Sequence, residues 1–449
     1  MGIGMAGFLG MGTVGESTDT TALLTTGQRP QSWRANILKL YGNGTLPLTG
    51  LTSQMASESV DDPQYNWWDQ VIEATTFTIT AGTIYTEATL TTAYVSGGTQ
   101  GSTVYIKTTA ANASLIVAGM VILMRDASNV DMDVLGRVSA VTVNGASSYL
   151  TTTLLEADDN STTDLSDCDT ILVVGSAFEE GGAMGDARSF KPTKHYNYTQ
   201  IFRTSLSLSR TAQQTKVRTN PQTYQKMKAE ALEMHGIDME LAFWFGKPYE
   251  TTLNSRPIRY TGGVFNWIKS NTYAAANNIS NYATEDTIDN GAYNGKTWIA
   301  TGGGIDWFNS MLERVFRYGG KERLAVCGNG ALLGIQRLAM AHGTFNLERI
   351  PNKFGMDIRQ WVTPFGTVYL QTHPLWNQQA MMRHRMALLE PQAYRYRYIQ
   401  DTKFFPDPDG NNKGNRIDGK NEEWLTECGL EFHHPETHGI LDGVGLDNS

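Results

Sequence analysis

Cysteine is scarce in this 449-residue chain. Cys168, Cys327 and Cys428 are odd in number, far apart, and without a C-x-x-C spacing. This excludes a disulfide framework and a cysteine zinc site, and it favours a reducing compartment. Charged residues are also few, at 18% against about 25% in ordinary soluble domains.

Long apolar runs and a basic surplus are missing as well. The longest apolar run, Leu115 to Met124, has ten residues, whereas a membrane-spanning helix needs about 20. No basic segment precedes the first apolar residues, so we expect no signal peptide and no membrane association. The formal charge of -9, from 36 basic and 45 acidic side chains, argues against a dedicated nucleic-acid binder.

The negative charge is confined to one segment. Residues 71–190 contain 4 of the 36 basic and 14 of the 45 acidic side chains, a net charge of -10. The other residues keep 32 basic and 31 acidic side chains, a net charge of +1. This asymmetry indicates that the acidic segment is a separate module.

The acidic segment has the pattern of an all-β domain. Six short runs rich in β-branched and aromatic residues are separated by Gly, Asn, Asp and Ser, which predicts a small barrel or sandwich. Asn144-Gly145 predicts a hairpin, because both positions tolerate positive φ. The predicted strands are 76–80, 103–107, 115–124, 136–143, 149–155 and 169–175.

A long strand and a long helix follow the acidic segment. Residues 201–209 alternate between polar and apolar positions, which predicts a strand. Asn220-Pro221 is typical of a helix start, and Gly246 and Pro248 end the helix predicted over 221–246. Its apolar residues recur every three or four positions, which predicts one packing stripe. The stripe consists of Tyr224, Met227, Ala231, Met234, Ile237, Leu241 and Phe245.

The remaining segments predict an arm and a mixed domain. Residues 1–65 are rich in Gly, Thr and Ser and cannot bury a core alone, so we expect an extended arm. Residues 262–400 alternate between helical and strand patterns, and 423–435 form a last strand. The expected fold class is α+β.

Two motifs suggest ligand chemistry. Residues 327–334, CGNGALLG, follow a strand and open a helix, but the third glycine comes one residue too late for a dinucleotide fingerprint. We interpret them as a tight turn. YRYRY, residues 394–398, places three tyrosines on one face and Arg395 and Arg397 on the other. We favour a half-buried strand whose arginines pair with carboxylates over tyrosines that stack on bases.

Two polar clusters suggest cation binding. HHPETH, residues 433–438, offers three histidines and a glutamate, but Pro435 breaks helical spacing, so we interpret it as a strand end. Residues 407–418 resemble a calcium loop but lack the glycine at the sixth position, so we expect a flexible loop. We predict no enzyme activity, no cofactor and no metal site.

The order of these elements resembles the major capsid proteins of tailed bacteriophages, the Hong-Kong-97-like fold. The resemblance is to a capsid subfamily with a β-domain before its long helix. Six segments carry it: YNWWDQ (65–70), NYTQIFRTSLSLSRTA (197–212), EMHGIDMELAFWFG (233–246), TGGVFNWI (261–268), TPFGTVYLQTHPLW (363–376) and LEFHHPETHGILDGV (430–444).

The resemblance implies a domain organisation. Residues 1–65 are the N-terminal arm, and 66–215 are the extension loop, carrying an acidic all-β insertion over about 81–190. Residues 216–261 and 401–449 are the peripheral domain with its spine helix, and 262–400 are the axial domain. The implied subunit contacts include Trp67, Trp68, Phe202, Arg203, Arg395 and Arg397.

The resemblance also implies a function. The chain is expected to assemble with itself into hexamers and pentamers of an icosahedral head around double-stranded DNA. Scaffolding, portal and decoration proteins are the implied partners, DNA is touched only weakly, and assembly takes place in the host bacterial cytoplasm. The alternative is another virion protein, such as a tail-tube or surface adhesion subunit, suggested by the β-rich insert.

Overall fold

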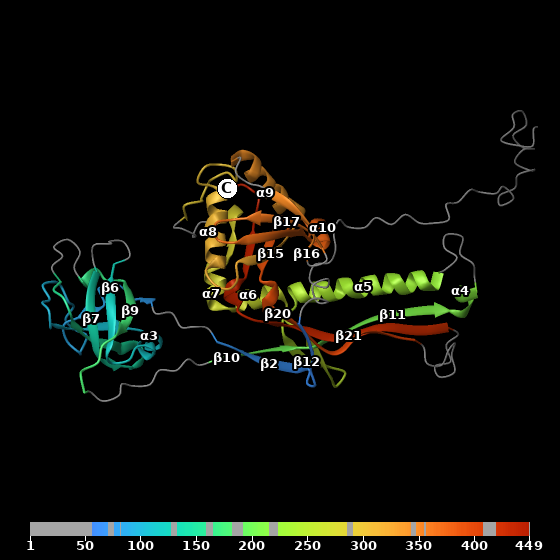
Figure 1. The fold of residues 1–449 in the computed structure, drawn as a ribbon. Coiled ribbons are helices and arrows are strands. Elements are labelled where there is room, and N and C mark those ends of the chain that lie inside the picture. The colour runs from blue at the N-terminus through green and yellow to red at the C-terminus, as the bar shows by residue number, and fades with distance from the viewer. Residues whose placement is uncertain are drawn as a thin grey trace, which may run out of the picture. The chain divides into compact units, whose positions relative to one another are not determined.

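A computed structural model describes most of the chain as two compact units. The units are Met1–Trp67 with His195–Ser449, and Trp68–Lys194. Both helices and strands are present, as the predicted α+β class requires (Figure 1). The described residues are 56–70, 76–80, 82–126, 133–158, 165–181, 192–214, 223–284, 291–342, 347–353, 356–406 and 419–448.

The unit Trp68–Lys194 contains a seven-stranded antiparallel sheet of order β3-β9-β6-β7-β8-β5-β4. The edge strands β3 and β4 are separated in sequence only by residues 79–83, so the sheet must curl to bring its two edges close together. The result is barrel-like, as predicted. The strands are β3 (Thr76–Thr78), β4 (Ile84–Tyr85), β5 (Thr103–Thr108), β6 (Met120–Arg125), β7 (Asp133–Thr142), β8 (Ser148–Leu154) and β9 (Thr170–Ser176).

Two local predictions in this unit need correction. The run 115–124 is not one strand, because helix α3 (Ala110–Leu115) ends within it and β6 begins only at Met120. Thr109 caps α3 by accepting a hydrogen bond from the backbone N–H of Asn112 at 3.2 Å. The Asn144-Gly145 hairpin does join β7 to β8, but through residues 143–147, with Gly145 alone at positive φ (52°).

The other unit begins with a long sheet under a long helix. Sheet order is β1-β20-β21-β11, and β11 pairs antiparallel with β21 along its whole length. Helix α5 lies along β11 and β21 (Figure 1). The elements are β1 (Ala56–Ser59), β11 (Gln200–Ser209), α4 (Arg210–Gln214), α5 (Thr223–Phe245), β20 (Tyr394–Phe405) and β21 (Gly419–Phe432).

Two small two-stranded sheets flank this assembly. Strands β2 (Gln64–Asp69) and β10 (Thr193–Tyr198) pair with each other. Strands β12 (Tyr249–Leu253) and β13 (Arg256–Tyr260) form a hairpin directly after α5. Its turn residues Asn254 and Ser255 both have positive φ, 50° and 62°, which matches the twist of a two-residue hairpin.

A second seven-stranded sheet, of order β14-β22-β19-β15-β18-β17-β16, forms the α/β part. Along β15, Leu324 and Val326 enter one core cluster, whereas Ala325 and Cys327 enter another. The sheet is therefore buried on both faces. Its strands are β14 (Ile279–Asn281), β15 (Glu322–Cys327), β16 (Leu347–Lys353), β17 (Met356–Val362), β18 (Thr367–Thr372), β19 (Met386–Leu389) and β22 (Gly439–Asp442).

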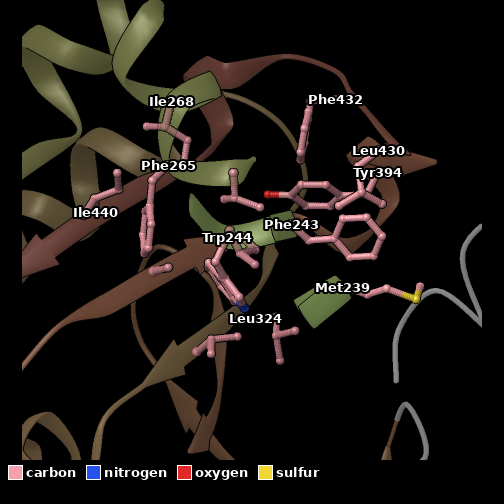
Figure 2. Packing of buried hydrophobic residues seen from close by; sticks show 14 of the residues in the cluster. Met239, Phe243, Trp244, Phe265, Ile268, Leu324, Tyr394, Leu430, Phe432 and Ile440 are labelled. Carbon is pink, nitrogen blue, oxygen red and sulfur yellow. The ribbon is translucent and has the colours of Figure 1, made fainter. Parts of the chain in front are cut away.

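Helices cover the two faces of this sheet. One core contains residues of α8 and α9, and the other contains residues of α5 and α6 (Figure 2). No helix within the described ranges is both long and apolar enough to cross a membrane. The helices are α6 (Val264–Ser270), α7 (Thr272–Asn277), α8 (Gly304–Phe316), α9 (Asn329–His342) and α10 (Pro374–Gln378).

Candidate subunit-contact surfaces

The base of α5 is anchored by a buried carboxylate. Glu240 is fully buried, and its Oε1 accepts hydrogen bonds from Trp244 Nε1 at 2.7 Å and from His373 Nε2 at 3.1 Å. His373 Nδ1 accepts the backbone N–H of Leu375 at 3.2 Å, which leaves the ring proton on Nε2. This group ties α5 to the segment between β18 and α10.

A buried histidine fixes the middle of α5 on the long sheet. His235 lies between two strands, with Nδ1 3.0 Å from Thr204 Oγ1 and Nε2 2.7 Å from Thr426 Oγ1. Burial lowers the pKa of His235, so the neutral ring is favoured. The predicted stripe missed both His235 and Glu240 because it counted only apolar residues. A polar side chain on a packed helix needs a buried partner, and that need was the signal that could have identified them.

The six segments that carry the capsid resemblance meet around this base. Asn197 Nδ2 donates to the carbonyl of Leu430 at 2.8 Å, and its Oδ1 accepts the N–H of Gly262 at 2.7 Å. Tyr65 donates its hydroxyl to the same Leu430 carbonyl at 2.9 Å. Segments far apart in sequence thus share one buried junction.

Glycines allow the backbones to approach at this junction. The N–H of Gly263 donates to the carbonyl of Gly246 at 2.9 Å, where α5 ends and α6 begins. A Cβ on Gly246 would overlap the carbonyl oxygens of Thr261 and Ala242. Gly246, Gly262 and Gly263 are therefore required for the close packing of these backbones.

The two predicted tryptophans lie in different environments. Trp67 is buried, with its ring centroid 5.4 Å from Trp267 and 6.2 Å from His433. Trp68, on the opposite face of β2, is 62% exposed. Within this chain Trp67 is a packing residue, and Trp68 is free to meet a neighbour.

Phe202 and the arginines also divide between core and surface. Phe202 is buried against Phe243, with ring centroids 6.4 Å apart. Arg203 is exposed and lies 3.4 Å from Glu423, and Arg395 is exposed on β20. These two arginines remain candidates for contacts with another subunit.

The YRYRY strand is half-buried, as the sequence favoured, and the predicted pairing with carboxylates is seen for Arg397. Arg397 pairs with Glu58 and with Glu431. Tyr394 and Tyr396 are buried, which removes their ring faces from any base. The base-stacking hypothesis is therefore wrong for these two tyrosines.

The predicted α5 stripe faces outward over its second half. The buried side of α5 is formed by Ala231, His235, Met239, Glu240, Phe243 and Trp244. Figure 2 shows Met239, Phe243 and Trp244 in the core. Tyr224 is partly buried and donates its hydroxyl to Glu422 at 2.5 Å, and Met227 is also partly buried.

The other four stripe residues line the outside of α5. Met234 is 60% exposed and Phe245 is 41% exposed, whereas Ile237 and Leu241 are half-buried. The stripe and the buried face are adjacent arcs of the helix, because α5 is apolar over more than one face. We name this set, Met234, Ile237, Leu241 and Phe245, the outer stripe.

The outer stripe runs into a shallow groove at the base of α5. The groove has a volume of about 610 Å³, and its lining includes Leu241, Phe245, Lys247, Tyr249 and Tyr260. Tyr249 and Tyr260 stack across the β12–β13 hairpin with ring centroids 6.4 Å apart. The groove has aromatic walls and one cationic side chain, with no cluster of acid and base groups.

The motifs that suggested ligands have structural roles. Residues 327–334 span the turn from β15 into α9 and the first residues of that helix, where a Cβ on Gly334 would overlap the backbone of Gly445. HHPETH follows the end of β21, and the described residues contain no cluster of three metal-ligating side chains. Residues 407–418 lie outside the described ranges.

A family model for the SU10 major capsid protein matches residues 16–445 of this sequence. The chain belongs to the SU10 major capsid protein family. The capsid resemblance seen in the order of the six segments is thereby confirmed, and so is the prediction of a structural protein and not an enzyme. As a phage major capsid protein, this SU10-family chain is part of the virion.

One curated relative and two solved structures are similar to this SU10-family chain. The major capsid protein of Pseudomonas phage PaMx41 is 21% identical over 432 residues, covering 92% of each chain. A chain of Mycobacterium phage Bobi has a TM-score of 0.42 and 8% identity, covering 95% of this chain and 98% of its own. The capsid of a native GTA particle has a TM-score of 0.42 and 6% identity, covering 96% and 99%.

Proposed function

We propose that the chain assembles with copies of itself into the hexamers and pentamers of an icosahedral head that encloses double-stranded DNA. The observation that carries the proposal, beyond family membership, is the exposed apolar surface of the outer stripe and the β12–β13 hairpin. Monomeric proteins rarely expose such continuous apolar surfaces, whereas subunits of assemblies do.

We assign roles to the segments on the same basis. Residues 216–261 and 401–449 are the peripheral domain, 262–400 the axial domain, 66–215 the extension loop with its insert at about 81–190, and 1–65 the arm. The junction around Glu240 supports this assignment, because it joins α5 to the α/β sheet by buried hydrogen bonds. A rigid joint of this kind suits a subunit that must present fixed edges to several neighbours.

Further partners follow from the same proposal. Scaffolding, portal and decoration proteins act with the shell, and assembly takes place in the host bacterial cytoplasm. The formal charge of +1 outside the acidic segment supports weak, non-specific contact with packaged DNA, since a surface that binds DNA tightly needs many cationic side chains.

Electron microscopy of the co-expressed head proteins tests the proposal. We expect closed particles whose surface lattice shows hexamers and pentamers. Rings or tubes without such a lattice would support the tail-tube or adhesion alternative instead, and a chain that stays monomeric with its scaffold present would refute both.

A further inference from the structure

The described residues leave the β12–β13 hairpin uncovered. None of its ten strand residues is buried, and Tyr249 and Leu253 are 58% and 60% exposed. A two-stranded hairpin in water is only marginally stable without a packed face. The outer stripe has two exposed residues, Met234 and Phe245, and it joins the hairpin at the groove, so the two together form one mainly apolar surface.

This surface is about 16 Å long along α5, from Met234 to Phe245, at 1.5 Å per residue. Charges at its two ends have opposite signs. Exposed Glu233 and Asp238 lie beside its first half, and exposed Lys247 and Arg256 lie at its hairpin end, where Glu250 is paired with Arg259. The surface thus has an acidic end, an apolar middle and a basic end.

Such a pattern is complementary to itself when two copies are placed antiparallel. The acidic end of one copy then meets the basic end of the other, and the apolar middles cover each other. A parallel arrangement would place like charges together. We propose that the outer stripe and the β12–β13 hairpin form a two-fold contact between two copies of this chain, with antiparallel α5 helices. This inference deepens the proposed assembly function and depends on it.

A two-fold contact has a signature that no head-to-tail contact shares. Each residue near the axis faces its own equivalent in the partner, whereas in a head-to-tail contact it faces a different residue. If Asp238 meets Lys247 of the second copy, the axis passes close to Leu241. A single cysteine placed there lies next to its own equivalent and can form a disulfide across the axis.

Cysteine substitution in assembled particles tests the contact. The native cysteines are all buried, so we expect them to form no disulfides between subunits. The variants are Leu241→Cys, Asp238→Cys and Phe245→Cys, each oxidised in assembled particles. In at least one of them, we expect most of the protein to migrate as a covalent dimer on a denaturing gel without reductant. Met340→Cys, on α9 and 77% exposed, is the matched control and should give at least tenfold less dimer.

Charge exchange is the second measurement. Asp238→Lys or Lys247→Asp alone should lower the particle yield and make it more sensitive to salt, because each places like charges opposite one another twice per contact. The double exchange Asp238→Lys with Lys247→Asp should restore both.

The outcomes separate the contact from assembly itself. Particles that form but give no dimer with any of the three cysteines would overturn the two-fold contact and leave the shell function intact. Absence of particles from the unmodified chain would overturn the shell function. Disulfides that appear only with a scaffolding or decoration protein present would assign the surface to that partner instead of to a second copy.

Discussion

At the scale of single residues, buried polar groups decide how the long helix is held. Glu240, His373 and His235 are all fully enclosed, yet each has hydrogen-bonding partners from other elements. Apolar packing alone tolerates sliding along a helix, whereas hydrogen bonds of fixed length do not. These residues therefore determine the register of α5 on the sheet.

Glu240→Ala tests this role. The change leaves the Trp244 and His373 N–H groups without an acceptor, so we expect the free energy of unfolding to fall by about 3 kcal/mol. Urea denaturation of the unassembled subunit measures it. Glu240→Gln keeps one acceptor oxygen and should lose less. Glu233→Ala, exposed on the same helix, should stay within about 0.5 kcal/mol of the parent, and an equal loss there would contradict the assigned role.

His438 makes stability depend on pH. Burial, with the nearby Arg323 cation, lowers the pKa of this histidine to about 3. An unfolded histidine has a pKa of about 6.5, so the unfolded chain takes up a proton at higher pH than the folded chain. The contribution of His438 to the free energy of unfolding is therefore complete above pH 6.5. It is lost as the pH falls toward 3, by up to about 1.4 kcal/mol per pH unit.

Denaturant unfolding between pH 7 and 4 measures this dependence. We expect His438→Asn, whose side-chain oxygen can replace Nδ1 as an acceptor, to show a shallower fall than the parent. His434→Asn is the control, since His434 is exposed and its positive φ of 49° suits asparagine. Equal slopes for His438→Asn and the parent would contradict a buried neutral ring.

At the scale of elements, the α5–α6 junction depends on glycine. In Gly246→Ala the new methyl group would overlap two carbonyl oxygens, so the ends of α5 and α6 must separate. We expect a loss of about 3 kcal/mol and a lower melting temperature by calorimetry. Gly175→Ala, on β9, has no atom within 4 Å of the added Cβ and should change little. If Gly246→Ala left the free energy of unfolding unchanged, the junction would not be tightly packed.

Periodicity predicted where the elements lie but not which helix face is buried. The long helix, predicted over 221–246, is described as Thr223–Phe245, and the strand and turn around residues 323–331 follow the pattern. The stripe Met234, Ile237, Leu241 and Phe245 is a true apolar stripe, yet it faces outward. Spacing alone cannot tell a core face from an exposed apolar face, because both have the same periodicity.

The candidate contacts were harder to predict than the elements. Trp67 and Phe202 are internal, whereas their sequence neighbours Trp68 and Arg203 are exposed. Alternation along a strand indicates two faces without saying which one meets the core. The hydrogen bond between Glu240 and His373 joins residues 133 positions apart, and no local sequence pattern predicts it.

At the scale of the whole molecule, charge suggests which side of a shell the acidic segment occupies. Its net charge of -10 would be repelled by packaged DNA, so we predict that it lies on the outside. A peptide epitope inserted after Gly145, in the exposed loop between β7 and β8, should bind its antibody on intact particles. Binding only after the particles are broken would place the segment inside.

The pairing of β2 with β10 has a practical consequence. These strands bring the two ends of the β-rich unit next to each other, since one leads into it and the other leads out. A foreign domain whose termini lie close together can therefore be spliced between Trp68 and Lys194 without lengthening either strand. Different domains can therefore be carried by the β2–β10 pair while the rest of the chain is unchanged.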